Sequence, residues 1–337
     1  MGFVACKENS TNPPQPKDKV GTVYSTENSP LPANHIFKVA VDKNGIVWLF
    51  LSELPDYSKK YLAIFNGEKW DIQKFDYPSA SSFAFDNENT VWIGTNGVGS
   101  AGILLHYDGN KWTTFDKNNS PLGQTSHFDI HSVAIDNQNN IWVGTNRGLA
   151  FYDREKWKMY TTDNSNLNNN VIYDLALDSN NNLWLTTGGG SITYFDGQDF
   201  IFYNFLDYGY YNHGSQHLVI DSNDQKWMDP SYMGIARFFV DSMYVYSKYN
   251  SEIPGYPNEV LALGSENDIW TAYNGKQPSG EGASLIHLQN GNKWTLYTQD
   301  NSDLPSPMMH DIATNKKTGS VWVATDSGLF LLDSNDL

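Results

Sequence analysis

The chain has 337 residues, and its 22 lysines and arginines against 38 aspartates and glutamates give a net charge of −16. This balance excludes nucleic-acid binders and polybasic membrane-surface proteins, because both rely on basic side chains. A single cysteine excludes an internal disulfide and a cysteine-rich metal cluster, while 14% aromatic residues are enough to build a large core.

Residues 1–19 are rich in Ser, Thr, Asn, Pro and Lys, and we expect a flexible tether there. The segment Phe-Val-Ala-Cys at positions 3–6 resembles the end of a bacterial lipobox, in which Cys6 would carry the lipid. The apolar stretch expected before such a cysteine is not in the sequence. A lone cysteine in a disordered terminus is therefore the alternative interpretation.

From residue 20 onward the sequence is a repeat. Seven tryptophans recur in one context at intervals of 42 to 52 residues: Trp48, Trp92, Trp142, Trp184, Trp227, Trp270 and Trp322. Three positions before each stands Gly, Asn or Asp, the types that tolerate the positive φ of a tight turn. Six positions before the tryptophan, five repeats carry an Asp that can bond to the backbone of its own turn.

Each repeat is predicted to form four short strands. In the third repeat these are Ser132 to Ile135, Ile141 to Thr145, Gly148 to Tyr152 and Lys156 to Tyr160. No segment has a convincing helical period of apolar residues. Four strands in 40 to 50 residues are typical of a β-propeller blade.

The two ends of the chain are predicted to share the last blade. The seventh repeat stops after its third strand, and residues 21–32 match residues 295–305, which hold the fourth strand of the sixth repeat. An N-terminal strand would therefore complete the ring and remove its open edge. We predict an all-β fold, a single seven-bladed β-propeller of four-stranded antiparallel blades over residues 20–337.

The repeated pattern D-x-x-N-x-[IVL]-W-[VIL]-G-T…G-[LI]-x-x-[YF]-D resembles the two-component regulator propeller repeat. That family supplies periplasmic sensor propellers of hybrid two-component systems in Bacteroidetes, whose members sense oligosaccharides released from dietary glycans. Those sensors continue into a β-sandwich, a membrane helix and a kinase. The present sequence shows one propeller and none of these, so the expectation is a stand-alone propeller, and signalling by this chain alone is not expected.

The first strand of each blade lines the central channel of a propeller, and most irregular sequence falls at the face where these strands begin. Eleven positions before the repeat tryptophans stand Phe37, Ser81, His131, Tyr173, Gln216, Glu259 and, after one inserted residue, His310. Ten positions before stand Lys38, Ser82, Ser132, Asp174, His217, Val260 and Asp311. This polar ring is either a binding site or simply a surface that meets water.

A second feature maps to the same face. The loop that enters the fifth blade contains Tyr208, Tyr210, Tyr211 and His213, with Tyr232, Tyr256 and Tyr273 expected in neighbouring connections. Exposed aromatic rings with a polar tip suit sugars and also protein partners. The alternative is that this long loop folds down on its own aromatic side chains.

The polar and aromatic residues of this face suit a non-catalytic protein that binds an oligosaccharide or a protein. The family resemblance and Cys6 imply a location in the periplasm or at the cell surface, and we expect a monomer with no cofactor. The Asp-Asn turns read as hairpins and not as Ca²⁺ loops, because the closing Glu is missing. The alternative is an enzyme. Streptogramin B lyases are similar propellers that use a divalent metal, and His131, Glu259 and His310 would then act as base, metal ligand and acid.

Overall fold

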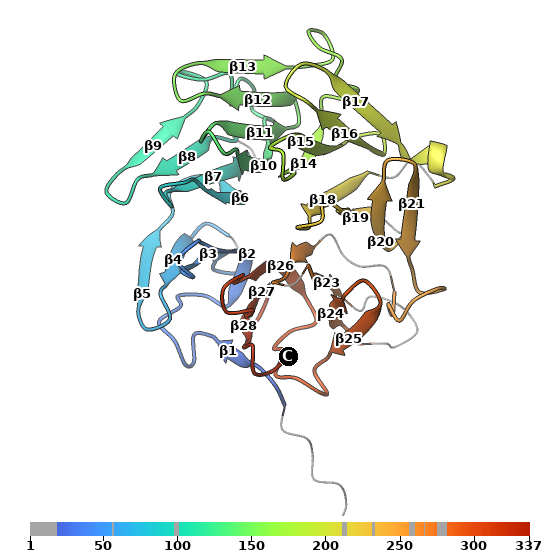
Figure 1. Ribbon diagram of the computed structural model, residues 1–337. Helices are drawn as coiled ribbons and strands as arrows, with labels where there is room; N and C mark the ends of the chain where they lie inside the picture. Colours follow the sequence, from blue (N-terminus) through green and yellow to red (C-terminus); the bar gives the residue numbers. More distant parts are fainter. Residues whose placement is uncertain are drawn as a thin grey trace, which may run out of the picture.

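Seven four-stranded antiparallel sheets surround a central axis in the computed structural model (Figure 1). The structure describes residues 19–337 except 56, 98–100, 211–213, 231–232, 256–259, 266 and 275–281. Strands β2, β6, β10, β14, β18, β22 and β26 form one edge of their sheets, and Figure 1 shows the inner strands facing the axis. The predicted fold is confirmed.

The first three blades follow one another along the chain, and each is a meander of four strands. Blade one holds β2 (His35–Val41), β3 (Val47–Ser52), β4 (Lys60–Phe65) and β5 (Trp70–Lys74). Blade two holds β6 (Ser79–Phe85), β7 (Val91–Asn96), β8 (Leu104–Tyr107) and β9 (Trp112–Phe115). Blade three holds β10 (Ile130–Ile135), β11 (Ile141–Thr145), β12 (Gly148–Tyr152) and β13 (Trp157–Tyr160).

Blades four to six have the same order. Blade four holds β14 (Ile172–Leu177), β15 (Leu183–Thr187), β16 (Ser191–Phe195) and β17 (Phe200–Asn204). Blade five holds β18 (Ser215–Ile220), β19 (Lys226–Pro230), β20 (Ile235–Phe239) and β21 (Ser242–Tyr246). Blade six holds β22 (Leu261–Leu263), β23 (Ile269–Tyr273), β24 (Ser284–Gln289) and β25 (Lys293–Tyr297).

The seventh blade is shared between the two ends of the chain, as predicted. It holds β26 (Met309–Thr314), β27 (Val321–Thr325) and β28 (Gly328–Leu332), and β1 (Thr22–Tyr24) is its outer strand. β1 pairs antiparallel with β28, with Val23 opposite Phe330. This pairing covers the edge of β28 that would otherwise be exposed and closes the ring.

In the part of the chain that the structure describes, one helical segment interrupts the strands, and the sequence did not indicate it. A 3-10 helix, η1 (Phe205–Tyr208), follows β17. Asn204 caps it by accepting a hydrogen bond from the Leu206 backbone N–H, and Gly209 ends it with φ 81°. In the described residues no helix is long and apolar enough to cross a membrane.

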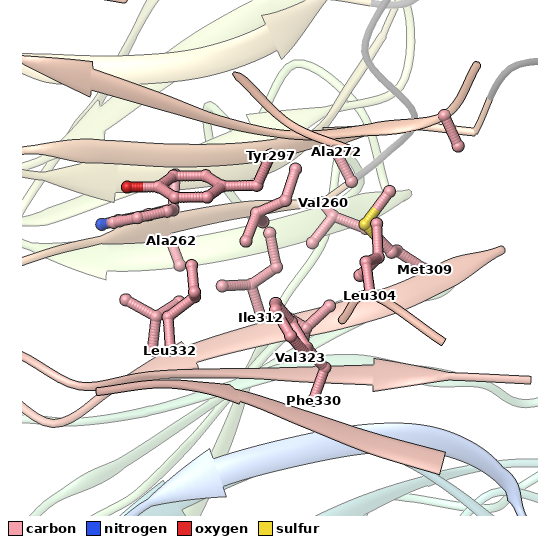
Figure 2. Close-up of a cluster of buried hydrophobic side chains, with 14 residues drawn as sticks. Val260, Ala262, Ala272, Tyr297, Leu304, Met309, Ile312, Val323, Phe330 and Leu332 are labelled. Carbon is pink, nitrogen blue, oxygen red and sulfur yellow. The ribbon is translucent and has the colours of Figure 1, made fainter. Parts of the chain in front are cut away.

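Apolar side chains pack mainly between neighbouring blades. Figure 2 shows the interface of blades six and seven, where Val260, Ala272 and Tyr297 face Ile312 and Phe330. These side chains are at most 7% exposed. Burial of such side chains contributes roughly 1.5–3 kcal/mol each, so the seven interfaces account for most of the stability.

The turn between the first and second strands of each blade lies at one face of the ring, here called the lower face. All seven residues predicted to have positive φ do so, for example Asn89 (61°) and Asn139 (66°). In blade two, Asp86 accepts hydrogen bonds from the Thr90 backbone N–H (2.8 Å) and from the Trp92 Nε1–H (3.3 Å). The same bond to the repeat tryptophan recurs in blades three, four and five.

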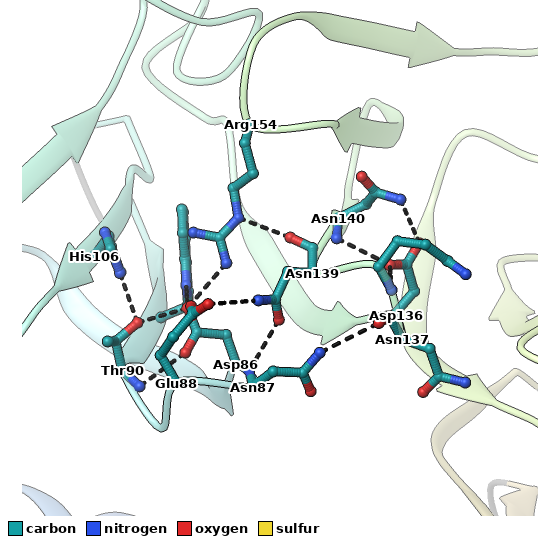
Figure 3. Close-up of polar contacts among 12 residues, drawn as sticks. Asp86, Asn87, Glu88, Thr90, His106, Asp136, Asn137, Asn139, Asn140 and Arg154 are labelled. Carbon is teal, nitrogen blue, oxygen red and sulfur yellow. Dashed lines mark hydrogen bonds and ion pairs between the residues drawn. The ribbon is translucent and has the colours of Figure 1, made fainter.

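These turns also connect neighbouring blades. The Asn139 Oδ1 of blade three accepts the Asn87 backbone N–H of blade two at 2.9 Å (Figure 3). The Asn181 Oδ1 of blade four accepts the Asn137 backbone N–H of blade three in the same way. Arg154 adds an ion pair to Asp86 at 2.9 Å. The Asp and Asn of the repeat are therefore structural residues.

Candidate functional site

The opposite face, where the first strands begin, is here called the upper face. It contains a cavity of about 900 Å³ at the mouth of the channel, here called the upper cavity. It is lined by Phe37, Lys38, Phe50, Ser52, Tyr57, Lys60, Ser79, Ala80, Ser81, Asn96, His131, Tyr173, Gln216, His217 and His310. A narrower space of about 170 Å³ shares Lys38, His131 and His217 with it and reaches Asp174 and Asp311.

A β-bulge shapes the wall of the channel. In blades one to five and seven the pairing register shifts near the start of the first strand, as between Ile36 and Lys38. Such a shift leaves a backbone N–H without a partner in its own sheet. A side chain of the preceding blade accepts it: Asp174 Oδ2 accepts from Leu218 (2.8 Å), and Asp311 Oδ2 from Val39 (3.1 Å).

These contacts change the interpretation of the polar ring. Asp174 Oδ1 also accepts the Ser132 hydroxyl at 2.6 Å, so this carboxylate joins blades three, four and five. Burial raises the pKa of Asp174, with its hydrogen bonds and His217 acting in the opposite direction. Asp174 and Asp311 were expected at the mouth, but they serve as inter-blade clamps lower in the channel.

Closer to the upper face than Asp174 and Asp311, His131 and Tyr173 form a stacked pair. The His131 Nδ1 donates to the Ile172 carbonyl oxygen at 2.7 Å, which leaves Nε2 as the acceptor of the neutral ring. The two rings lie 5.9 Å apart between centroids, with an interplanar angle of 16°. Both residues line the upper cavity and the channel below it. The bond to Ile172 holds the His131 ring in place, and the pair presents an aromatic surface to the cavity.

His217 pairs with a buried carboxylate. Its Nδ1 lies 2.8 Å from Asp229 Oδ2, and Asp229 Oδ1 accepts the backbone N–H groups of Gln216 and His217. Burial lowers the pKa of His217, but Asp229 and then Asp174 raise it, and the net shift is upward. Lys38 stands 3.8 Å from Asp311 on the same wall.

The upper cavity is more cationic than the chain as a whole. Lys38, Lys60 and His217, whose pKa is raised, line it, and no carboxylate is among its described lining residues. The Lys60 ammonium donates to the Tyr77 carbonyl oxygen, and burial lowers the pKa of this lysine. The chain carries a net charge of −16, so this lining is a local exception.

Blade one supplies an aromatic wall that the repeat pattern did not indicate. Phe37 lies 5.9 Å from Phe50 and 5.9 Å from Tyr57 between ring centroids. Tyr57 is 49% exposed and stands in the long connection between β3 and β4. The unusual length of the connection between β3 and β4 is the feature of the sequence that could have indicated Tyr57 as a site residue.

Two further residues were missed at the junction of blades seven and one. Asp326, in the turn between β27 and β28, accepts contacts from His35 Nε2 at 2.7 Å and from His310 Nε2 at 2.6 Å. Burial lowers the pKa of His35, while Asp326 raises it and His310 lowers it. An acidic residue four positions after the repeat tryptophan occurs in this repeat alone, which could have singled out Asp326.

The structure brings together five of the predicted site residues: His131, Tyr173, Gln216, His217 and His310. Others fall outside the described residues, so their placement stays a prediction: Cys6, Tyr211, His213, Tyr232, Tyr256 and Glu259. Three predicted residues do not line this cavity: Tyr208, Tyr210 and Tyr273. The lyase interpretation keeps His131 and His310 in one cavity, without a described position for Glu259.

The tyrosines before blade five fold against that blade. The Tyr208 hydroxyl donates to the Val240 carbonyl oxygen at 2.9 Å, and its ring contacts Phe238 edge-on. The Tyr210 hydroxyl donates to the Met243 carbonyl oxygen at 3.3 Å. Tyr273 is the last residue of β23 and only 3% exposed. Tyr208 and Tyr210 therefore pack as in the alternative interpretation of this loop, and Tyr273 is buried in blade six. Ligand contact by these three rings stays a prediction.

The two component regulator propeller family matches residues 125–147 and 166–189, which lie in blades three and four. No curated protein matches the sequence. One similar structure is the extracellular domain of BT3049 from B. thetaiotaomicron, which is described as a hybrid two component system. It is 18% identical to this chain with a TM-score of 0.74, and the match covers 94% of this chain and 41% of the BT3049 chain. The corresponding domain of BT4673 is 15% identical with a TM-score of 0.68, covering 93% and 40%.

A catalytically inactive virginiamycin B lyase from Staphylococcus aureus, bound to quinupristin, is 13% identical with a TM-score of 0.68, covering 93% of this chain and 98% of its own. These structures share the fold. The chain spans about two fifths of the length of the two Bacteroides domains. It is a seven-bladed β-propeller that resembles the two-component regulator propeller family and carries that family's repeat in blades three and four.

Proposed function

We propose that this propeller is a non-catalytic, extracytoplasmic binding module that takes an oligosaccharide in the upper cavity. The observation that carries this proposal is the stacked pair of His131 and Tyr173 in a polar cavity of about 900 Å³. A flat aromatic surface beside fixed hydrogen-bonding groups suits a sugar ring. Within the described residues, the Tyr173 hydroxyl and the Gln216 side-chain amide form no hydrogen bond, so both are available to a ligand.

The charge of the lining narrows the ligand class. Lys38, Lys60 and the raised pKa of His217 favour an anionic group, and none of the described lining residues is a carboxylate that would repel one. We therefore propose a glycan fragment that carries a uronic acid or a sulfate. The resemblance to sensor propellers supports the extracytoplasmic location. Attachment through a lipid on Cys6 belongs to the same proposal, and a Cys6→Ser chain that stays in the membrane fraction would count against it.

Calorimetric titration with neutral and acidic oligosaccharides tests the proposal. We expect an acidic fragment to bind, Tyr173→Ala to weaken it by about tenfold or more, and the melting temperature to change little, because stacking contributes roughly 1–2 kcal/mol. Tyr244→Ala is the matched control, since Tyr244 is 48% exposed on the outer strand β21.

Two outcomes would contradict the proposal. If no oligosaccharide binds at millimolar concentration, or if Tyr173→Ala binds as the unchanged chain does, the upper cavity is not the glycan site. If mass spectrometry finds the bound fragment cleaved after incubation, the module is an enzyme and the lyase interpretation gains support.

A further inference from the structure

Two histidines converge on one carboxylate oxygen where the ring closes. His35 is the first residue of β2 in blade one, and His310 lies in β26 of blade seven. Their Nε2 atoms lie 2.7 and 2.6 Å from Asp326 Oδ1, and the three atoms all lie within 4.8 Å of one another. They come from three separate elements of two blades, so the fold and not a local turn brings them together.

The other histidine–aspartate pairs among the described residues differ from this arrangement. His217 meets Asp229 at 2.8 Å, and His287 meets Asp268 at 2.9 Å, with one imidazole to each carboxylate. In both pairs the carboxylate also accepts a backbone N–H, so it belongs to a local hydrogen-bond network. At Asp326 a second imidazole approaches the same oxygen atom, and the three atoms form a set of potential metal ligands.

The equivalent position in other blades shows a structural alternative. Four residues after the repeat tryptophan, blade three has Asn146 and blade six has Asn274. Asn146 accepts the Asp129 backbone N–H, and Asn274 accepts the Met309 backbone N–H. An asparagine thus suffices to hold the entry of a first strand. Blade seven has Asp326 at this position, and its carboxylate contacts two imidazoles.

The surroundings of His35 point in the same direction. This residue is 7% exposed, and its Nδ1 is buried with no hydrogen-bond partner among the described residues. Nε2 is therefore the ring nitrogen that protein atoms engage, and it lies 2.7 Å from Asp326 Oδ1. His35 thus places its Nε2 beside Asp326 Oδ1 and the His310 Nε2, where the three atoms could bind one ion.

We propose that His35 Nε2, His310 Nε2 and Asp326 Oδ1 bind a divalent transition metal ion, with zinc as the preferred metal. Two imidazoles and one carboxylate are a typical zinc ligand set that leaves a fourth position open. Because His310 lines the upper cavity, that position would face the cavity and take water or an oxygen of a ligand. The metal would also join blades one and seven. This proposal goes beyond the oligosaccharide proposal and does not depend on it.

The test uses the full chain, freed of metal with a chelator and then titrated with Zn²⁺, and with Co²⁺ as a spectroscopic probe. We expect one zinc ion to bind per chain, Co²⁺ to develop visible d–d bands, and zinc to raise the melting temperature. His310→Ala and Asp326→Asn should each lower the zinc affinity by roughly tenfold or more. Both side chains are partly exposed, so these variants should fold.

His127→Gln is the matched control, because His127 is an exposed histidine on the same face whose imidazole contacts Ser126. It should bind zinc as the unchanged chain does. Absence of zinc binding up to about 1 mM, or equal affinity in His310→Ala, Asp326→Asn and His127→Gln, would overturn the proposal. Repeating the oligosaccharide titration on metal-free protein separates the two proposals, since glycan binding without metal leaves only the zinc site in question.

Discussion

The lower and upper faces of this propeller use polar residues in contrasting ways. At the lower face the same Asp and Asn recur blade after blade, and their side chains bond to the repeat tryptophan and to the next turn. At the upper face the residue at one register position varies among the blades, as with Lys38, Ser82 and Asp174. Repetition thus identifies residues that build the ring, and departures from it identify candidates for function.

The contrast is not complete, because part of the upper face is also structural. Asp174, Asp311 and Ser82 each accept a backbone N–H of a following blade. These clamps line the narrower space below the upper cavity, which the stacked pair also reaches, whereas His310 lines the upper cavity only. The contacts that a polar side chain makes, and not its polarity alone, therefore distinguish a clamp from a candidate site residue.

The largest effect is expected at the lower face. Asp86→Ala removes the acceptor of Thr90 and Trp92 and leaves Arg154 without its carboxylate. Breaking a buried ion pair on one side costs about 3–5 kcal/mol, so the free energy of unfolding should fall by that amount in denaturant titration.

Asp153→Ala is the control for this change. Asp153 accepts backbone N–H groups in an exposed turn of blade three, and its loss should cost less than about 1 kcal/mol. If the two variants are equally stable, the lower-face carboxylates do not carry the structural role assigned to them.

An intermediate effect is expected from the channel. Asp174→Ala leaves the Leu218 backbone N–H and the Ser132 hydroxyl without their acceptor, so the free energy of unfolding should fall by about 2–3 kcal/mol. Asp174→Asn keeps one acceptor oxygen and removes a charge that burial disfavours, so it should cost less than the alanine. Chemical denaturation measures both. An alanine variant as stable as the unchanged chain would place Asp174 among the functional residues instead.

The fold could be predicted almost completely from the sequence, because the same turn and strand pattern occurs in seven repeats. The turn φ values, the four-strand blades and the closing β1–β28 pair all followed from residue types at regular spacing. The site could be predicted only in part. Register placed His131, Tyr173 and His217 at the mouth, but Tyr208 and Tyr210 found partners in blade five that no local pattern encodes.

The cluster of His35, His310 and Asp326 shows why the rest could not be predicted. His35 is separated from His310 and Asp326 by most of the chain and meets them only because the ring closes between blades seven and one. Their side chains come from different positions of the repeat, so no single register aligns them. Long-range geometry of this kind needs the three-dimensional structure.

The smallest effect is expected from the titration of His217 at the upper face. Asp229 and Asp174 favour its protonated form in the folded chain, while Lys38 and burial oppose it, and its pKa is raised overall. The stabilising contribution is therefore complete below the unfolded-chain pKa of about 6.5 and is lost as the pH rises through the folded pKa. His217→Gln should be less stable than the unchanged chain by about 1 kcal/mol at pH 5.5, and the gap should narrow toward pH 9. Denaturant titration across that range measures the gap, with His127→Gln expected to follow the unchanged chain throughout. A gap that widens as the pH rises would mean that His217 is held neutral, and the cationic character assigned to the upper cavity would then rest on its two lysines.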